Sequence, residues 1–102
     1  MDLHGKLQVR DQGRSGHIDV SIGGDSLSFY WEFCGGECVV AVNVPTPEEW
    51  ASTPRYARFE RREFLTALAR ELAAMRCKGC KFEIATHHLN MLEPSSERGE
   101  VT

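Results

Sequence analysis

The sequence predicts an α+β protein in which an antiparallel β-meander of three to four strands precedes one amphipathic helix and a closing strand. Apolar and polar residues alternate through most of the first half, which is typical of half-buried strands. Two Gly-Gly pairs, at 23–24 and 35–36, divide this region where hairpin turns would fall. A stripe of apolar residues at helical spacing follows between residues 58 and 76. We expect that helix to pack on one face of the sheet.

The two Gly-Gly pairs can adopt the positive φ angles that two-residue hairpin turns require. Such turns fix which residues face each other, and both turns place the large apolar side chains on the same face of the meander. The predicted pairs are Val20 with Leu27, Ile18 with Phe29, Phe33 with Cys38, Trp31 with Val40, and Phe29 with Val42. A shorter alternation at Leu7 and Val9 predicts a first strand.

The second half predicts helices and one final strand. Thr46-Pro47-Glu48-Glu49 combines a threonine cap, a proline at the first helical position and a glutamate at the third, which predicts a short helical turn carrying Trp50. The longer helix is expected to end before Gly79, and residues 81–84 then alternate as a strand returning beside the meander. Residues 1–86 are therefore expected to form a single domain, and residues 87–102 a flexible tail.

Length and composition narrow the class of protein. The 102 residues suffice for one hydrophobic core but not for two domains of ordinary size. A net charge of −3 argues against a nucleic-acid binder, which usually carries a basic surface. No apolar run is long enough to span a membrane, and no signal-peptide pattern begins the chain. We therefore expect a cytoplasmic protein whose four cysteines are reduced thiols or metal ligands.

The four cysteines raise the possibility of a metal site. Cys34-x3-Cys38 and Cys77-x2-Cys80 resemble the two halves of a four-thiolate zinc site. In the predicted hairpin, however, Cys34 and Cys38 lie on opposite faces and cannot bind one ion without a bulge or a different turn. Cys80 follows the helix stop at Gly79, where a hydrophobic contact is common. We therefore expect the cysteines to be buried thiols or thiols without a functional role, and a small zinc-binding module is the alternative.

Catalytic residues do not form a recognisable pattern. The four histidines, His4, His17, His87 and His88, are scattered over the termini and one strand, with no nucleophile placed beside them. The glycine pairs lie between strands and do not precede a helix N-terminus, so they are not phosphate-binding loops. We therefore expect a protein that is not an enzyme and that needs no cofactor.

The polar face of the meander is the candidate partner-binding surface. It is expected to carry His17, Asp19, Tyr30, Glu32 and Glu37, with His17 opposite Tyr30. Its carboxylates suit a basic partner, and a tyrosine is a good amphipathic anchor at an interface. The alternative interpretation is an ordinary solvated sheet face.

The order of elements resembles the small bacterial immunity proteins that accompany polymorphic toxins, including those of contact-dependent growth inhibition. The resemblance extends from Ile18 to Ile84 and depends on Trp50 with Pro54, the helix stripe from Phe64 to Met75, and Gly79 before Phe82-Glu83-Ile84. It implies a cytosolic protein that binds and neutralises one cognate toxin, commonly a nuclease, without catalysis. The four cysteines depart from what we expect of that group.

Overall fold

The computed structural model describes residues 1–36 and 38–94. Its strands form one six-stranded antiparallel sheet in the order β1-β2-β3-β4-β6-β5. The α+β class predicted from the sequence is confirmed, with more strands than expected. The elements are β1 (Leu7–Asp11), β2 (Ser15–Ile22), β3 (Asp25–Phe33), β4 (Cys38–Asn43), α1 (Pro47–Ser52), α2 (Pro54–Ala57), α3 (Arg61–Arg76), β5 (Lys81–Ile84) and β6 (His88–Leu92).

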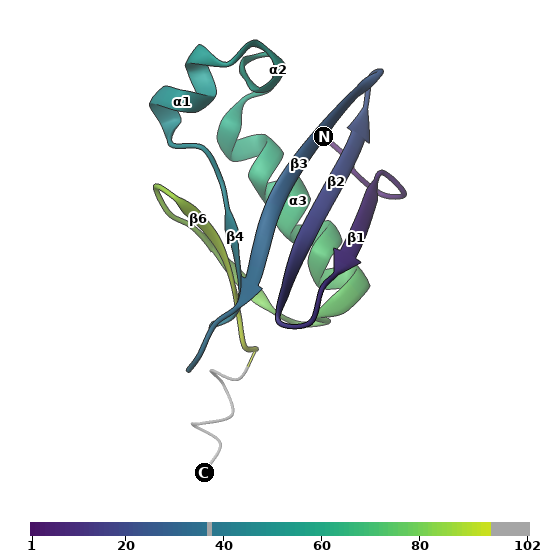
Figure 1. Ribbon diagram of the computed structural model, residues 1–102, viewed down its shortest axis with the longest axis vertical. Helices are drawn as coiled ribbons and strands as arrows, with labels where there is room; N and C mark the ends of the chain where they lie inside the picture. Colours follow the sequence, from purple (N-terminus) through teal and green to yellow (C-terminus); the bar gives the residue numbers. More distant parts are fainter. Residues whose placement is uncertain (37, 95–102) are drawn as a thin grey trace.

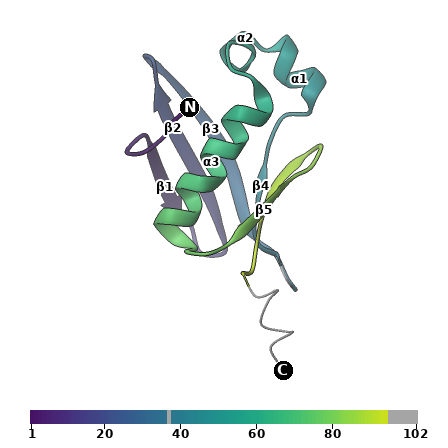
Figure 2. The same cartoon turned by 180° about the vertical axis from the view of Figure 1, so that it is seen from behind.

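The helices lie on one side of the sheet and leave the other side open (Figures 1 and 2). The long helix α3 crosses this covered side, which we call the inner face. The short helices α1 and α2 sit together at the end of the sheet where β4 leaves it (Figure 1). We call the uncovered side the outer face.

The β2–β3 hairpin has the register predicted from its glycine turn. Val20 faces Leu27, Ile18 faces Phe29, and both glycines of the 23–24 turn have positive φ. Because side chains alternate between faces along a strand, this register buries every second residue of β2 and β3 on the inner face.

The predicted register of the β3–β4 hairpin is wrong by two residues. Trp31 faces Val42 and Phe33 faces Val40, instead of Val40 and Cys38. The turn is longer than two residues, because the amide of Cys38 donates to the carbonyl of Gly35 and the amide of Cys34 donates to the carbonyl of Val39. A shift of two residues preserves the alternation, so Val42 still points into the core.

The predicted tail from residue 87 is wrong over residues 88–92. That segment forms β6, which is inserted between β4 and β5, so β5 does not itself return beside the meander. Leu89 and Met91 are buried on the inner face and explain why this segment packs. The expectation of a flexible tail at residues 95–102 falls outside the described residues.

The core forms between the inner face and the apolar stripe of α3. Phe64, Leu65 and Leu68 are completely buried, as the helical spacing predicts, whereas Met75 at the end of the stripe is exposed. The helix begins at Arg61, later than predicted, and Glu60 caps it by accepting from the amides of Arg62 and Glu63.

The predicted capping box of the short helix is confirmed. Thr46 accepts a hydrogen bond from the amide of Glu49, whose side chain accepts from the amide of Thr46. The helix buries Trp50 against Phe64, with 5.5 Å between ring centroids. This aromatic contact joins α1 to α3.

Candidate functional site

The outer face brings together four of the five residues predicted to bind a partner. His17 and Asp19 come from β2, and Tyr30 and Glu32 come from β3. Each alternates with a buried residue, so all four point away from α3. The fifth, Glu37, lies outside the described residues.

Tyr30 lies in the middle of this surface. It faces His17 across the β2–β3 pair, as predicted, and the two rings meet edge to face with 5.7 Å between centroids. Its side chain is 37% exposed, so the aromatic ring has support on one side and solvent on the other. A tyrosine held in this way can supply contact area to a partner without losing much conformational entropy.

Asp19 is tied into the sheet surface and is not a free charge. Its carboxylate forms an ion pair with Arg10 at 2.8 Å from Nε and accepts a hydrogen bond from the Ser28 hydroxyl. The Ser28 hydrogen bond lowers the pKa of Asp19, partial burial opposes this change, and Arg10 adds to the lowering. Asp19 therefore contributes to the cross-strand packing of β1, β2 and β3.

Replacing Asp19 by asparagine is expected to lower the free energy of unfolding by about 1 kcal/mol at pH 7. Because the folded pKa of Asp19 is depressed, its contribution is complete above the ordinary value of 3.8 and is lost as the pH falls through the lowered pKa. The difference between wild type and Asp19→Asn, measured by urea unfolding, should therefore shrink below about pH 4. A difference that stays constant down to about pH 2 would contradict this assignment.

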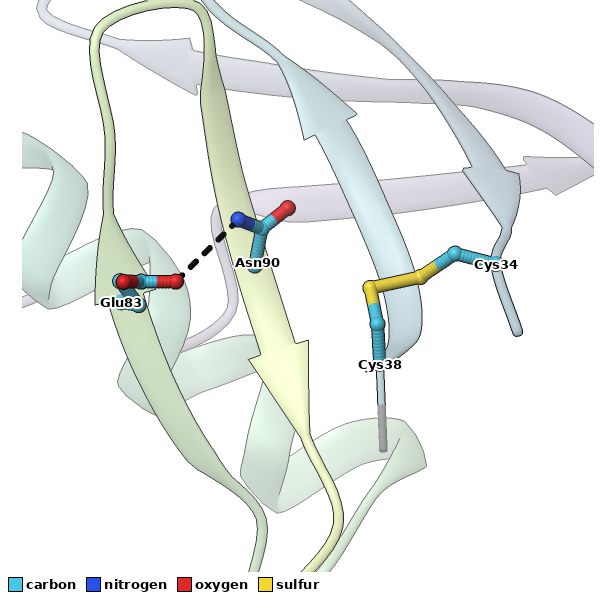
Figure 3. The surroundings of a disulfide bond; sticks show 4 residues. All are labelled: Cys34, Cys38, Glu83 and Asn90. Carbon is cyan, nitrogen blue, oxygen red and sulfur yellow. Dashed lines mark hydrogen bonds between the residues drawn. A yellow bond between two sulfur atoms is a disulfide. The ribbon is translucent and has the colours of Figure 1, made fainter. Parts of the chain in front are cut away.

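The sequence analysis did not predict two further outer-face residues, Asn90 and Glu83. Glu32 faces Ala41, which faces Asn90, which faces Glu83, so one row of side chains runs across β3, β4, β6 and β5. Asn90 donates to Glu83 at 3.5 Å, as Figure 3 shows. The row was not predicted, because residues 88–92 were expected to be tail. Alternation would have identified it, since Leu89 and Met91 are apolar and Asn90 is not.

The charge of the outer face is only weakly acidic. Arg10 neutralises Asp19 locally. On β5, Lys81 lies two residues before Glu83 and on the same face. Within the described part of the chain, the carboxylate of Glu32 forms no ion pair or hydrogen bond. Glu32 and Glu83 are thus the carboxylates on this face best placed to meet a cation of another molecule.

The four cysteines form two local pairs and do not meet in one site. Cys34 and Cys38 are joined across the end of the β3–β4 hairpin (Figure 3), and Cys77 and Cys80 are joined after α3. The longer turn accounts for the first pair, because it moves Cys38 out of register with Phe33 and brings its Cα within 5.5 Å of that of Cys34. The expectation of reduced thiols is therefore not met.

No metal centre is formed by the residues that the structure describes. They include no group of three or more histidine, cysteine, aspartate or glutamate side chains that could hold an ion. The four-thiolate zinc alternative, Cys34 with Cys38, Cys77 and Cys80, is not formed in this structure, in which Cys34 is bonded to Cys38 and Cys77 to Cys80. None of the helices described is both long and apolar enough to cross a membrane.

Among the described residues, Arg61 is the other group with a perturbed pKa, and its role is structural. Burial lowers the pKa of its guanidinium, the neighbouring Arg62 adds to this, and Glu48 opposes it. The guanidinium donates to the carbonyls of Pro45, Ala85 and Thr86, and so joins the start of α3 to two connections of the sheet. These bonds use Nε and Nη2 and give the side chain a structural place in the fold.

Comparison with known proteins identifies no relative of this chain. No protein-family model, curated protein or solved structure matches this chain.

Proposed function

We propose that this protein is a non-catalytic binding protein that holds a basic protein domain against its outer face. The observation that carries the proposal is the open sheet face, where Tyr30 is half-exposed beside the carboxylate of Glu32, which has no ion pair among the described residues. A rigid antiparallel sheet presents these side chains at fixed spacing, which reduces the ordering cost of binding.

The kind of partner follows from the chemistry of this face. Aromatic side chains at the centre of an interface supply most of its energy, and surrounding charges mainly set specificity and the rate of association. Tyr30 would be the anchor, and Glu32 and Glu83 would attract lysines or arginines of the partner. The resemblance to immunity proteins makes a toxin, commonly a nuclease, the partner we favour, since nuclease surfaces are often basic.

A cytoplasmic location belongs to the same proposal, because an immunity protein of this kind acts where its toxin would do damage. Cytosolic reductants keep most protein thiols reduced. Both local cysteine pairs would then open in the cytoplasm and close only upon oxidation.

The proposal predicts that charge reversal on the outer face slows association. The double substitution Glu32→Lys and Glu83→Lys should lower the association rate constant with the toxin domain encoded beside the gene about tenfold at low salt. The difference should diminish in high salt, because exposed charges are then screened. Biolayer interferometry with the immobilised toxin domain measures both rates.

A matched control carries the same change in net charge elsewhere. Glu48 and Glu93 are exposed and lie outside the outer-face row, so their double reversal to lysine should leave the association rate near that of wild type. Equal slowing by both double variants would mean that only net charge matters and would remove the outer face from the proposal. Failure of the wild-type protein to protect cells that express the toxin domain would overturn the immunity function itself.

A further inference from the structure

The strand β5 lies at one end of the sheet and has a free edge. In the order β1-β2-β3-β4-β6-β5, β6 is the only described strand that pairs with it. The two strands form the hairpin at the side of the sheet far from β1 (Figures 1 and 2). A free edge presents backbone donors and acceptors to any further strand that can align with it.

The backbone groups that face this edge belong to Phe82 and Ile84. The amide of Ala85 donates to the carbonyl of His88 at 2.8 Å, so these two residues form a hydrogen-bonded pair of the β5–β6 ladder. Along an antiparallel ladder, hydrogen-bonded pairs alternate with pairs whose backbone groups point away from each other. The N–H and C=O groups of Ile84 and Phe82 therefore point away from β6.

The two faces of β5 carry different side chains. Phe82 and Ile84 lie on the inner face and, like Cys80 just before the strand, are partly buried against the core. Lys81 and Glu83 lie on the outer face and are exposed. The edge thus combines an incompletely covered apolar row with a cation and an anion two residues apart.

The sequence of β5 is complementary to itself when a second copy runs antiparallel to it. A two-fold axis perpendicular to the sheet at Phe82 keeps the inner faces of both copies on one side. It places Lys81 opposite Glu83 of the second copy and Glu83 opposite Lys81, and opposite charges that face each other across strands are stabilising. On the inner face Phe82 meets its own copy, and Ile84 meets Cys80, so the apolar row continues across the axis.

Other alignments of this edge are less favourable. An axis at Lys81 or at Glu83 places that residue opposite its own copy, and like charges directly opposite are destabilising. An axis at Ile84 carries Lys81 past the end of the opposing strand, so both charge pairs are lost. The charges of β5 therefore select the alignment at Phe82.

The strand β1, at the other end of the sheet, lacks this complementarity at its three central residues. An axis at Gln8 places Lys6 opposite Arg10, and an axis at Arg10 places that residue opposite its own copy. Like charges meet in both alignments. An axis at Val9 brings Asp11 against an apolar side chain. Self-pairing is thus favoured at β5 and not at β1.

We propose that two copies of this protein pair through their β5 strands about a two-fold axis at Phe82 and join their sheets into one. The amide and carbonyl of Phe82 exchange hydrogen bonds with those of its copy. Tyr30 and Glu32 lie on β3, with β4 and β6 between them and β5, so they remain open in the dimer. Because β5 has only four residues, the interface is small, and we expect a weak dimer with a Kd of roughly 10 μM to 1 mM.

Sedimentation equilibrium at protein concentrations from about 10 μM to about 1 mM tests the dimer. The 11.5 kDa chain should shift reversibly to twice that mass. Non-reducing gel electrophoresis checks that cysteines do not cross-link the copies. A chain that stays monomeric up to about 1 mM, or that forms larger assemblies, would overturn the proposal, since a two-fold interface closes at two copies. The protein is measured alone, so a negative result leaves the proposed binding function untouched.

Charge reversal tests the alignment. Lys81→Glu places two carboxylates opposite each other at both symmetry-related positions, and Glu83→Lys places two cations there, so each should weaken the dimer at least about fivefold. The double variant Lys81→Glu with Glu83→Lys restores opposite charges and should recover the wild-type Kd to within about twofold. Lys6→Glu is the matched control, because Lys6 is exposed and lies at the other end of the sheet, and it should leave the Kd unchanged. Circular dichroism checks that all variants fold. No recovery in the double variant, or equal weakening by Lys6→Glu, would overturn pairing at β5.

Amide hydrogen exchange tests the same edge without any substitution. The exchange of the Phe82 and Ile84 amides should slow with rising protein concentration, in proportion to the fraction of dimer found by sedimentation. The amide of Val9 is the control, because it points away from β2 at the other free edge and should exchange equally fast at all concentrations. Concentration-independent exchange at Phe82, or equal slowing at Val9, would contradict the dimer.

Discussion

Replacement of Phe64 by alanine is expected to lower the free energy of unfolding by about 3–5 kcal/mol. Phe64 is fully buried where α3 meets the sheet and the short helices. Its ring contacts those of Phe29, Trp50 and Phe59, with centroid distances of 6.1, 5.5 and 5.3 Å. Removal of the ring leaves a cavity that no single neighbour can fill.

Urea unfolding followed by tryptophan fluorescence measures this loss, with Met75→Ala as the control on the same helix. Met75 is 41% exposed, so its truncation should change the free energy of unfolding by less than about 0.5 kcal/mol. A loss below about 1.5 kcal/mol for Phe64→Ala would show that α1 and α2 do not pack on α3 as described.

The second large effect is expected at Gly16, which faces Trp31 on β3 and Asp11 on β1. A Cβ atom at this position would overlap the carbonyl oxygen of Arg10 and lie 3.0 Å from Cζ2 of Trp31. Because the closest neighbour is backbone, β1 must move to make room. We expect Gly16→Ala to destabilise the protein by about 3 kcal/mol.

Gly35→Ala provides the matched glycine control. Nothing lies within 4 Å of a Cβ added at Gly35, and its φ is not positive. Its unfolding midpoint should therefore stay close to that of wild type, whereas that of Gly16→Ala should fall. Equal stability of the two variants would contradict the close approach of β1 and β2 at Gly16.

The parts of the fold that were predictable are those determined by local sequence. The β2–β3 register follows from the glycine turn at 23–24 and from alternation alone, and the capping box at Thr46 follows from four consecutive residues. The stripe on α3 follows from helical spacing. In each case short-range chemistry and long-range packing favour the same conformation.

The parts that failed depend on contacts between distant segments. The residues at 35–36 could form a two-residue turn, but β3 pairs with β4 in a register shifted by two residues, and β4 pairs with β6 on its other side. Residues 88–92 contain a histidine and an asparagine among three apolar residues, which is a weak strand signal by itself. That segment pairs with β5 next to it in sequence and with the edge of β4, which is far away in sequence.

Only part of the candidate site was predicted, because some of its residues are brought together by pairing between distant segments. His17, Asp19, Tyr30 and Glu32 share a face because they lie on one hairpin whose register was correct. Asn90 and Glu83 joined them only through β6. The neutralisation of Asp19 by Arg10 also escaped prediction, because the register between β1 and β2 was not among the predicted pairs.

The position of β6 has a consequence for synthesis of the chain on the ribosome. It is the last of the described strands to emerge, yet it lies inside the sheet and separates β4 from β5. Until it emerges, β4 is an edge strand with unpaired backbone groups, and the apolar side chains of its inner face are only partly covered. Closure of the sheet therefore waits for β6, and the nascent protein depends on the first four strands staying soluble until then.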